Sequence, residues 1–124
     1  MDNKLLLVDD EEGIRKVLGI ALSDSGYEVY TAENGEDALK VFRKETPPIV
    51  LTDIKMPGMG GIELLKKIKQ EIPDTEVIMI TGHGDMDLAI KSLKYQAIDF
   101  VTKPINDDVL EIALNRANEK IRMR

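Results

Sequence analysis

Short apolar runs alternate with longer amphipathic segments along the whole chain, and this alternation is the main organisational signal in the sequence. The apolar runs predict strands at Lys4–Val8, Glu28–Ala32, Ile49–Thr52, Glu76–Thr81 and Asp99–Thr102. Runs such as Leu5–Val8 and Val77–Ile80 lack polar alternation, which is typical of central strands in a parallel sheet with helices on both faces. The alternation therefore predicts repeated βα units.

Between the strands, apolar residues recur at the spacing of one helical face. Such stripes are formed by Ile14, Val17, Leu18, Ala21 and Leu22, by Ile62, Leu65, Ile68 and Ile72, and by Leu110, Ala113, Leu114, Ala117 and Ile121. They predict helices that pack on the sheet. A further helix over Met86–Leu93 has a smaller stripe of Met86, Ala89, Ile90 and Leu93, so we expect it to pack weakly and to be free to shift.

Turn residues mark the boundaries between these elements. Ser25–Gly26 ends the first helix, Asn34–Gly35 opens the second, and Thr46–Pro48 enforces an extended entry into the third strand. Asn106 or Asp107 can cap the last helix. The order of elements predicts a doubly wound α/β fold, a (βα)5 three-layer sandwich whose five-stranded parallel sheet has the flavodoxin-like order 2-1-3-4-5.

Composition narrows the class of protein. A chain of 124 residues can bury the core of one domain, and with 3 tyrosines, 2 phenylalanines and no tryptophan that core must be aliphatic. A net charge of −6 disfavours direct binding to nucleic acid or to a membrane surface and favours a protein or a cation as partner. The lack of cysteine excludes thiolate metal sites and cysteine nucleophiles. No signal-peptide core or membrane span is recognisable, so we expect a cytoplasmic location.

Polar residues gather where the predicted strands end. Asp9 and Asp10 follow the first strand, Asp53 follows the third, Thr81 ends the fourth, and Lys103 follows the fifth. Because the carboxyl ends of parallel strands meet at one edge of a sheet, we expect these side chains to converge. Two carboxylates about 4 Å apart repel by roughly 4 kcal/mol at an effective dielectric near 20, so a cation would relieve the cluster. Oxygen ligands without His or Cys favour Mg²⁺ over zinc.

Two interpretations of this edge differ in how much they explain. Asp9 and Asp10 taken alone are most simply a cap for the first helix. That interpretation leaves the hydroxyl of Thr81 and the ammonium of Lys103 unexplained. Phosphoryl transfer uses every group, because an ionised Asp53 can attack phosphorus while Mg²⁺, Lys103 and Thr81 neutralise or bind the phosphoryl oxygens.

The chain resembles the receiver domains of two-component response regulators over nearly its whole length. The motifs that carry the resemblance are Leu7–Glu11, Thr52–Gly58, Ile80–Gly82 and Asp99–Pro104. Within the family, the chain is most similar to receivers of the nitrogen-regulator type and to small sporulation phosphorelay receivers. The resemblance implies a phosphorylation-dependent signalling switch, which catalyses only its own phosphorylation and dephosphorylation and is not otherwise an enzyme.

The resemblance also implies a role for each residue of the site. Asp53 would accept the phosphoryl group from the phosphohistidine of a sensor histidine kinase or a phosphotransfer protein. Asp10, Asp53 and the backbone carbonyl of Lys55 would hold Mg²⁺, with Asp9 acting through water. Thr81 and Lys103 would contact the phosphoryl group.

The implied switch reaches beyond the phosphorylation site. Thr81 would move toward the phosphoryl group and Phe100 would change rotamer, which remodels the face of the fourth helix, fifth strand and fifth helix. That face would control an output domain or partner, or support a phosphorylation-dependent homodimer. The bond between Lys103 and Pro104 would be cis, which X-Pro bonds permit at a cost of about 0.5–1 kcal/mol.

Two positions depart from the family pattern. Gly60 stands where an Asp commonly precedes the third helix and is a weaker cap. Gln96 stands where a Gly is usual, so a left-handed turn retained there would be strained.

Two further residues lie close to the site in the sequence. Lys55, two residues beyond Asp53, is expected either to cover the phosphoryl oxygens and slow hydrolysis of the phosphoryl group or to be solvated and idle. His83 is expected to be exposed and without a catalytic role.

Other functions are less consistent with the sequence. A haloacid-dehalogenase-like enzyme would also use an Asp nucleophile and Mg²⁺, but no Asp-x-Asp signature directly follows a predicted strand, as that enzyme class requires. The presence of Asp9, Asp10 and Asp53 together argues against a receiver-like module that is never phosphorylated. Nucleotide binding is not supported, because the sequence lacks a Gly-rich phosphate loop. Since the last helix has a basic end and runs to Arg124 without a stop signal, we expect residues 1–124 to be a receiver domain cut from a longer protein, with a stand-alone receiver as the alternative.

Overall fold

The computed structural model describes residues 2–124, in which strands and helices alternate strictly along the chain. The strands are β1 (Lys4–Val8), β2 (Glu28–Ala32), β3 (Ile49–Asp53), β4 (Glu76–Thr81) and β5 (Asp99–Thr102). The helices are α1 (Glu12–Asp24), α2 (Gly35–Glu45), α3 (Gly61–Glu71), α4 (Met86–Lys94) and α5 (Asp107–Arg122). The predicted strands are confirmed, and β3 extends one residue further to include Asp53.

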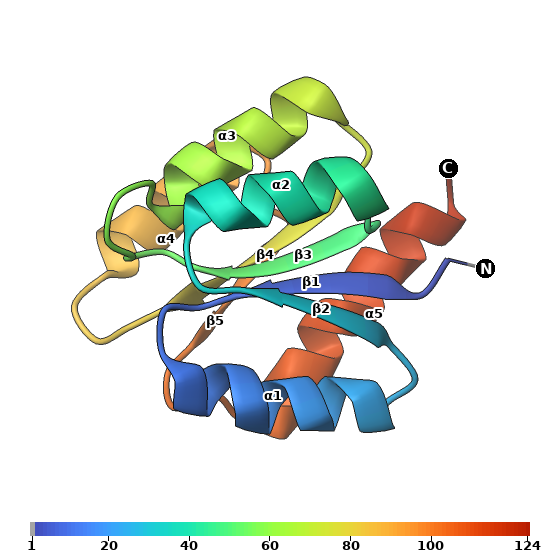
Figure 1. Cartoon of the computed structure of the whole chain (residues 1–124), viewed down its shortest axis with the longest axis horizontal. Helices are drawn as coiled ribbons and strands as arrows, with labels where there is room; N and C mark the ends of the chain where they lie inside the picture. The colour runs from blue at the N-terminus through green and yellow to red at the C-terminus, as the bar shows by residue number, and fades with distance from the viewer. Residues whose placement is uncertain (1) are drawn as a thin grey trace.

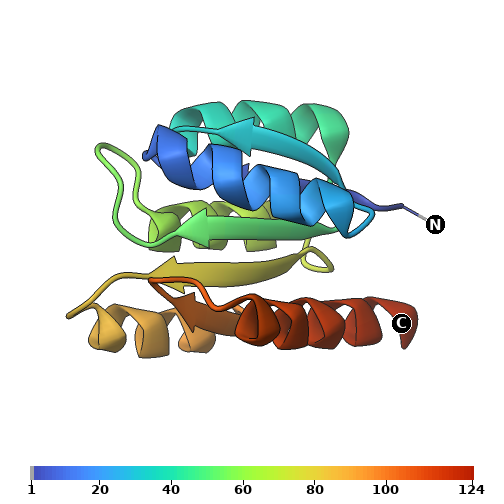
Figure 2. The ribbon, with the colours of Figure 1, turned by 90° about the horizontal axis from the view of Figure 1, so that it is seen from below.

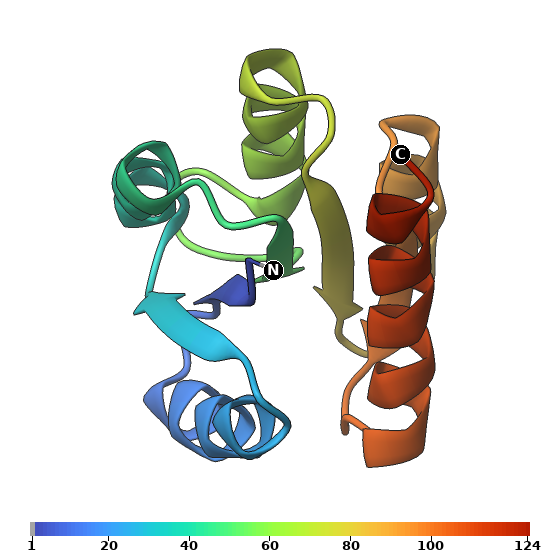
Figure 3. The same ribbon diagram turned by 90° about the vertical axis from the view of Figure 1, so that its right-hand side faces the viewer.

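All five strands are parallel and lie in the order β2-β1-β3-β4-β5. Helices α1 and α5 cover one face of the sheet, and α2, α3 and α4 cover the other (Figure 1; Figure 3). This is the predicted doubly wound, flavodoxin-like arrangement. Within residues 2–124, no helix combines the length and the apolar character that crossing a bilayer requires.

The central strands divide their side chains between two apolar cores. In β1, Leu6 and Val8 pack against the helices of one face, while Leu5 and Leu7 pack against those of the other. Every residue of β3 and β4 is buried. Burial on both faces explains why these strands read as continuous apolar runs in the sequence.

The helical stripes of α3 and α5 lie against the sheet as predicted, but two details of the other helices were wrong. Val17 was expected on the packing face of α1, yet 73% of its surface is exposed. In α4, Met86, Ile90 and Leu93 are exposed, while Ala89 and Ser92 are the residues buried against the sheet. The apolar residues of α4 therefore lie largely on its outer face, which agrees with the expected weak packing of this helix although not with the expected stripe.

The sheet directs every strand toward one edge, where the site lies. Figure 2 shows the arrowheads of β2, β3, β4 and β5 pointing to the same side of the molecule, and β1 runs parallel to β2. At that edge, the peptide bond between Lys103 and Pro104 is cis. Gly60 precedes α3 without a side-chain cap, and Gln96 retains the left-handed turn after α4 with a φ of 80°.

Candidate functional site

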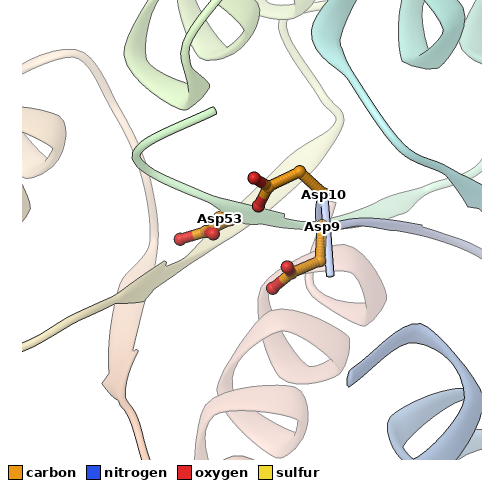
Figure 4. Close-up of side chains that lie close together, drawn as sticks. All are labelled: Asp9, Asp10 and Asp53. Atoms are coloured by element: carbon orange, nitrogen blue, oxygen red, sulfur yellow. The ribbon is translucent and has the colours of Figure 1, made fainter. Parts of the chain in front are cut away.

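Three aspartates from neighbouring strands meet at the carboxyl edge of the sheet. Asp9 and Asp10 directly follow β1, and Asp53 is the last residue of β3. These strands are adjacent and in register at Val8 and Thr52, which places Asp9 beside Asp53. One carboxylate oxygen from each of the three aspartates lies within 4.8 Å of the others (Figure 4). The predicted convergence of the carboxylates is thus present.

Asp9 is completely buried, and its two oxygens have different surroundings. Oδ1 accepts a hydrogen bond of 2.9 Å from the backbone N–H of Glu11, at the start of α1. Oδ2 accepts no hydrogen bond, although it lies 3.3 Å from Nζ of Lys103. A capping role therefore accounts for one oxygen of Asp9 and leaves the other available to a cation.

The backbone around Asp53 is held by close contact with α3. The N–H of Gly61 donates a 2.8 Å hydrogen bond to the carbonyl of Ile54, and a side chain at Gly61 would collide with the carbonyl oxygen of Asp53. Glycine at this position allows the first turn of α3 to lie directly against the end of β3. This role of Gly61 was not predicted, because a close backbone approach leaves no pattern in the sequence.

Lys103 brings a positive charge into the acidic cluster from the end of β5. Its Nζ lies 3.2 Å from Asp53 Oδ2 and 3.2 Å from Glu11 Oε1, in addition to its contact with Asp9. Burial disfavours the charged ammonium, but attraction to Asp53 and Asp9 outweighs this and raises the pKa of Lys103. Lys103 is therefore a permanent cation at neutral pH. The contribution of Glu11 was not predicted, because an exposed acid at a helix start has many ordinary explanations.

The buried carboxylates remain hard to ionise together despite this lysine. Burial, followed by repulsion from Asp9, raises the pKa of Asp53 to about 6, and Lys103 limits the rise. Burial likewise raises the pKa of Asp9. A cluster of three carboxylates facing one ammonium has an excess of negative charge, and its donor atoms are all oxygen. Since Asp9 Oδ2 accepts no hydrogen bond and every donor atom is an oxygen, this set of ligands fits a hard divalent cation such as Mg²⁺.

The remaining predicted residues also lie at or near this edge. Thr81 is buried at the end of β4, and its hydroxyl donates a long 3.4 Å hydrogen bond to the carbonyl of Gly82. Phe100 is half-buried in β5, beside Met79 of β4. His83 is exposed in the loop after β4.

Lys55 lies in the loop after β3, and its side chain has a partner that the sequence did not predict. Its Nζ is 2.8 Å from Asp85 Oδ1, in the loop between β4 and α4. The two residues belong to separate loops, so neither periodicity nor local spacing could reveal the pair. The ammonium is thus engaged rather than idle.

Comparison with known proteins identifies the family. The profile of the response regulator receiver domain matches residues 5–115. The chain belongs to this family. The receiver domain is 41% identical over 111 residues to the DNA-binding transcriptional regulator NtrC of Escherichia coli K12, a match that covers 90% of this chain and 24% of NtrC. It is 38% identical over 115 residues to the regulatory protein AtoC of the same organism, covering 93% of this chain and 25% of AtoC.

Solved structures agree with this assignment. A response regulator receiver domain protein from Clostridium thermocellum superposes with a TM-score of 0.92 at 37% identity, and the match covers 98% of both chains. The receiver domain spans about a quarter of the length of its curated relatives NtrC and AtoC. Membership of the family makes this chain a domain of phosphorylation-based signalling in two-component systems.

Proposed function

We propose that Asp53 accepts a phosphoryl group from the phosphohistidine of a sensor histidine kinase or phosphotransfer protein, with Mg²⁺ at the acidic cluster. The observation that carries the proposal is the meeting of Asp9, Asp10 and Asp53 with Lys103 at one edge of the sheet. No helix cap or structural ion pair requires three carboxylates and one ammonium at this place.

The chemistry follows from the groups of the site. A carboxylate oxygen of Asp53 attacks phosphorus, the bond from phosphorus to the histidine nitrogen breaks, and the electron pair of that bond stays with the imidazole. The ammonium of Lys103 loses its ionic partner on Asp53 as the acyl phosphate forms and is in place to pair with a phosphoryl oxygen. The hydroxyl of Thr81 can turn from its long bond with Gly82 to donate to another phosphoryl oxygen.

Asp10, Asp53 and the backbone carbonyl of Lys55 would hold Mg²⁺, with Asp9 assisting through water. When bound, this ion supplies positive charge to the phosphoryl oxygens during transfer. The excess negative charge of the three aspartates and the lack of a hydrogen bond to Asp9 Oδ2 support a Mg²⁺ site here.

A protein phosphodonor is supported by the surface next to the site. Val17 and Ile20 on α1 are 73% and 63% exposed, and Val17 lines a cavity together with Ile14, Pro104 and Ile105. An exposed apolar surface next to Lys103 fits a protein phosphodonor better than a small ester.

We further propose that phosphorylation acts on the face of α4, β5 and α5 through Thr81 and Phe100. The shallow packing of α4 and its exposed Ile90 and Leu93 support a helix that can shift and contact another surface. That surface belongs to an output domain, a partner or a second phosphorylated copy. Because its relatives are about four times as long, we propose that residues 1–124 act as the receiver domain of a longer cytoplasmic regulator, whose output lies outside this domain.

Intact mass spectrometry with acetyl phosphate tests the central proposal. The protein should gain the mass of one phosphoryl group with Mg²⁺ present, and should gain none after chelation or in Asp53→Ala. An equal gain in Asp53→Ala would refute phosphorylation at Asp53. Sustained hydrolysis of many phosphate esters per protein molecule would instead favour a phosphatase.

A further inference from the structure

An ion pair connects the phosphorylation loop to the start of α4. Lys55 follows Asp53 by two residues, and its Nζ lies 2.8 Å from Asp85 Oδ1, immediately before α4. The side chain of Lys55 is 67% exposed, while that of Asp85 is 12% exposed. A largely buried carboxylate is thus neutralised by a lysine that reaches it from the neighbouring loop.

Asp85 does not perform the role that its position favours. An aspartate directly before a helix normally accepts a hydrogen bond from an amide of the first turn, as Asn34 and Asn106 do for α2 and α5. Asp85 makes no such bond. Its other oxygen is turned back over Gly82, 3.3 Å from where a Cβ would stand on that residue. The carboxylate is held on the side of Lys55 and away from the free amides of α4.

The loop held by this pair is the one that carries the Thr81 hydroxyl. The carbonyl of Gly82 accepts both the Thr81 hydroxyl at 3.4 Å and the N–H of Asp85 at 3.3 Å. Thr81 and Asp85 therefore share one acceptor. A loop held at Asp85 therefore also holds the carbonyl to which the Thr81 hydroxyl donates.

We propose that the ion pair of Lys55 with Asp85 is a latch that holds the loop after β4 in its unphosphorylated arrangement, so that both residues are positioning residues for Thr81. The inference rests on the proposed function. A phosphoryl group on Asp53 offers Lys55 a partner of higher charge, two residues away. Once Lys55 changes partner, Asp85 is free to cap α4, and the loop can bring Thr81 to the phosphoryl group.

The proposed latch should change the affinity of the site for a phosphoryl group, and this change can be measured. If the pair stabilises the unphosphorylated arrangement, breaking it must favour binding of a phosphoryl group by the same factor. Ion pairs with one exposed member contribute modestly, so the factor is about two- to fivefold. The mimic beryllofluoride, used with Mg²⁺, reports this factor as an affinity without the chemistry of transfer.

Asp85→Asn is the decisive variant, because it breaks the latch and leaves Lys55 in place. It should bind beryllofluoride about two- to fivefold more tightly than the wild type. The gain should disappear when Asp85→Asn is made in a Lys55→Met background and persist in a Lys55→Arg background. Asp87→Asn, which removes an acid from the first turn of α4 outside the pair, should leave the affinity unchanged. In the unliganded protein, Asp85→Asn should also move the amide resonances of Thr81 and α4 toward their beryllofluoride-bound positions.

Binding of beryllofluoride to the wild type and to the variants distinguishes failure of the phosphorylation site from failure of the latch. If the wild type fails to bind beryllofluoride, the proposed function fails and the latch with it. If the wild type binds but Asp85→Asn gives no gain, or gives the same gain in the Lys55→Met background, the latch is refuted while the phosphorylation site stands.

Discussion

Lys103 Nζ lies 3.2 Å from Asp53 Oδ2, so a residue after β5 neutralises the proposed phosphoacceptor at the end of β3. The same ammonium is 3.3 Å from the buried Asp9. One lysine thus opposes the rise in pKa that burial causes at both carboxylates. The arrangement keeps Asp53 ionised enough to act as a nucleophile and leaves a cation beside the position where a phosphoryl oxygen would lie.

Removing the charge of Lys103 should destabilise the metal-free protein. In Lys103→Met, Asp9 and Asp53 lose their ionic partner while they stay buried, and we expect a loss of about 1–3 kcal/mol in the free energy of unfolding near neutral pH. Urea unfolding measures this. Mg²⁺ should recover much of the loss, since it neutralises the same carboxylates. Lys103→Arg retains the charge and serves as the control; equal stability of wild type and Lys103→Met without metal would contradict the proposed charge balance.

The raised pKa of Asp53 predicts how stability depends on pH without metal. Its folded-state pKa of about 6 lies above the ordinary value of 3.8, so the folded state binds the proton more tightly. The resulting stability is fully present below about pH 4 and is lost as pH rises through about 6, a loss on the order of 3 kcal/mol. The free energy of unfolding of Asp53→Asn should not show this loss, so the difference between the wild-type and variant curves reports the titration of Asp53.

Urea unfolding of both proteins in chelator, followed by the same series with Mg²⁺, measures the effect. Mg²⁺ should stabilise the wild type more at about pH 7 than at about pH 5, because it favours the ionised carboxylates. A wild-type curve parallel to that of Asp53→Asn across this range would mean that Asp53 titrates normally.

The sequence predicted the order of elements and the residues at the strand ends, because both depend on local patterns and on the geometry of parallel sheets. It did not predict which way α1 and α4 present their apolar residues, since periodicity defines a stripe but not the helix rotation that tertiary packing selects. Val17 and Ile90 are exposed for this reason. The pair of Lys55 with Asp85 escaped prediction because it joins two loops whose relative position exists only in the folded chain.

The left-handed turn at Gln96 should be a source of instability. Its φ of 80° is favourable for glycine and costs other residues about 1–2 kcal/mol. Gln96→Gly should therefore raise the free energy of unfolding by roughly 0.5–1 kcal/mol, after allowance for the greater flexibility of glycine in the unfolded chain. Thermal melts of Gln96→Gly and Gln96→Ala provide the comparison. A gain in the alanine variant, or none in the glycine variant, would show that the turn carries no strain.

The lifetime of the phosphoryl group should depend on the side chain of Lys55. Before phosphorylation this ammonium is bound to Asp85, so any protective role begins only after it changes partner. Once beside the phosphoryl oxygens, its charge attracts them and its stem hinders a water molecule from attacking in line. We therefore expect slow loss of the phosphoryl group in the wild type, and a loss about two- to tenfold faster in Lys55→Asn, which corresponds to roughly 0.4–1.4 kcal/mol of barrier.

Decay of the phosphorylated protein after removal of acetyl phosphate measures this rate, with Lys55→Arg as the charge-preserving control. Asp85→Asn adds a second comparison, because it frees Lys55 to stay with the phosphoryl group and should slow the decay or leave it unchanged. An unchanged rate in Lys55→Asn would mean that the ammonium never covers the phosphoryl group. The pair with Asp85 would then be its whole contribution, and the affinity measurements on Asp85→Asn would decide that role alone.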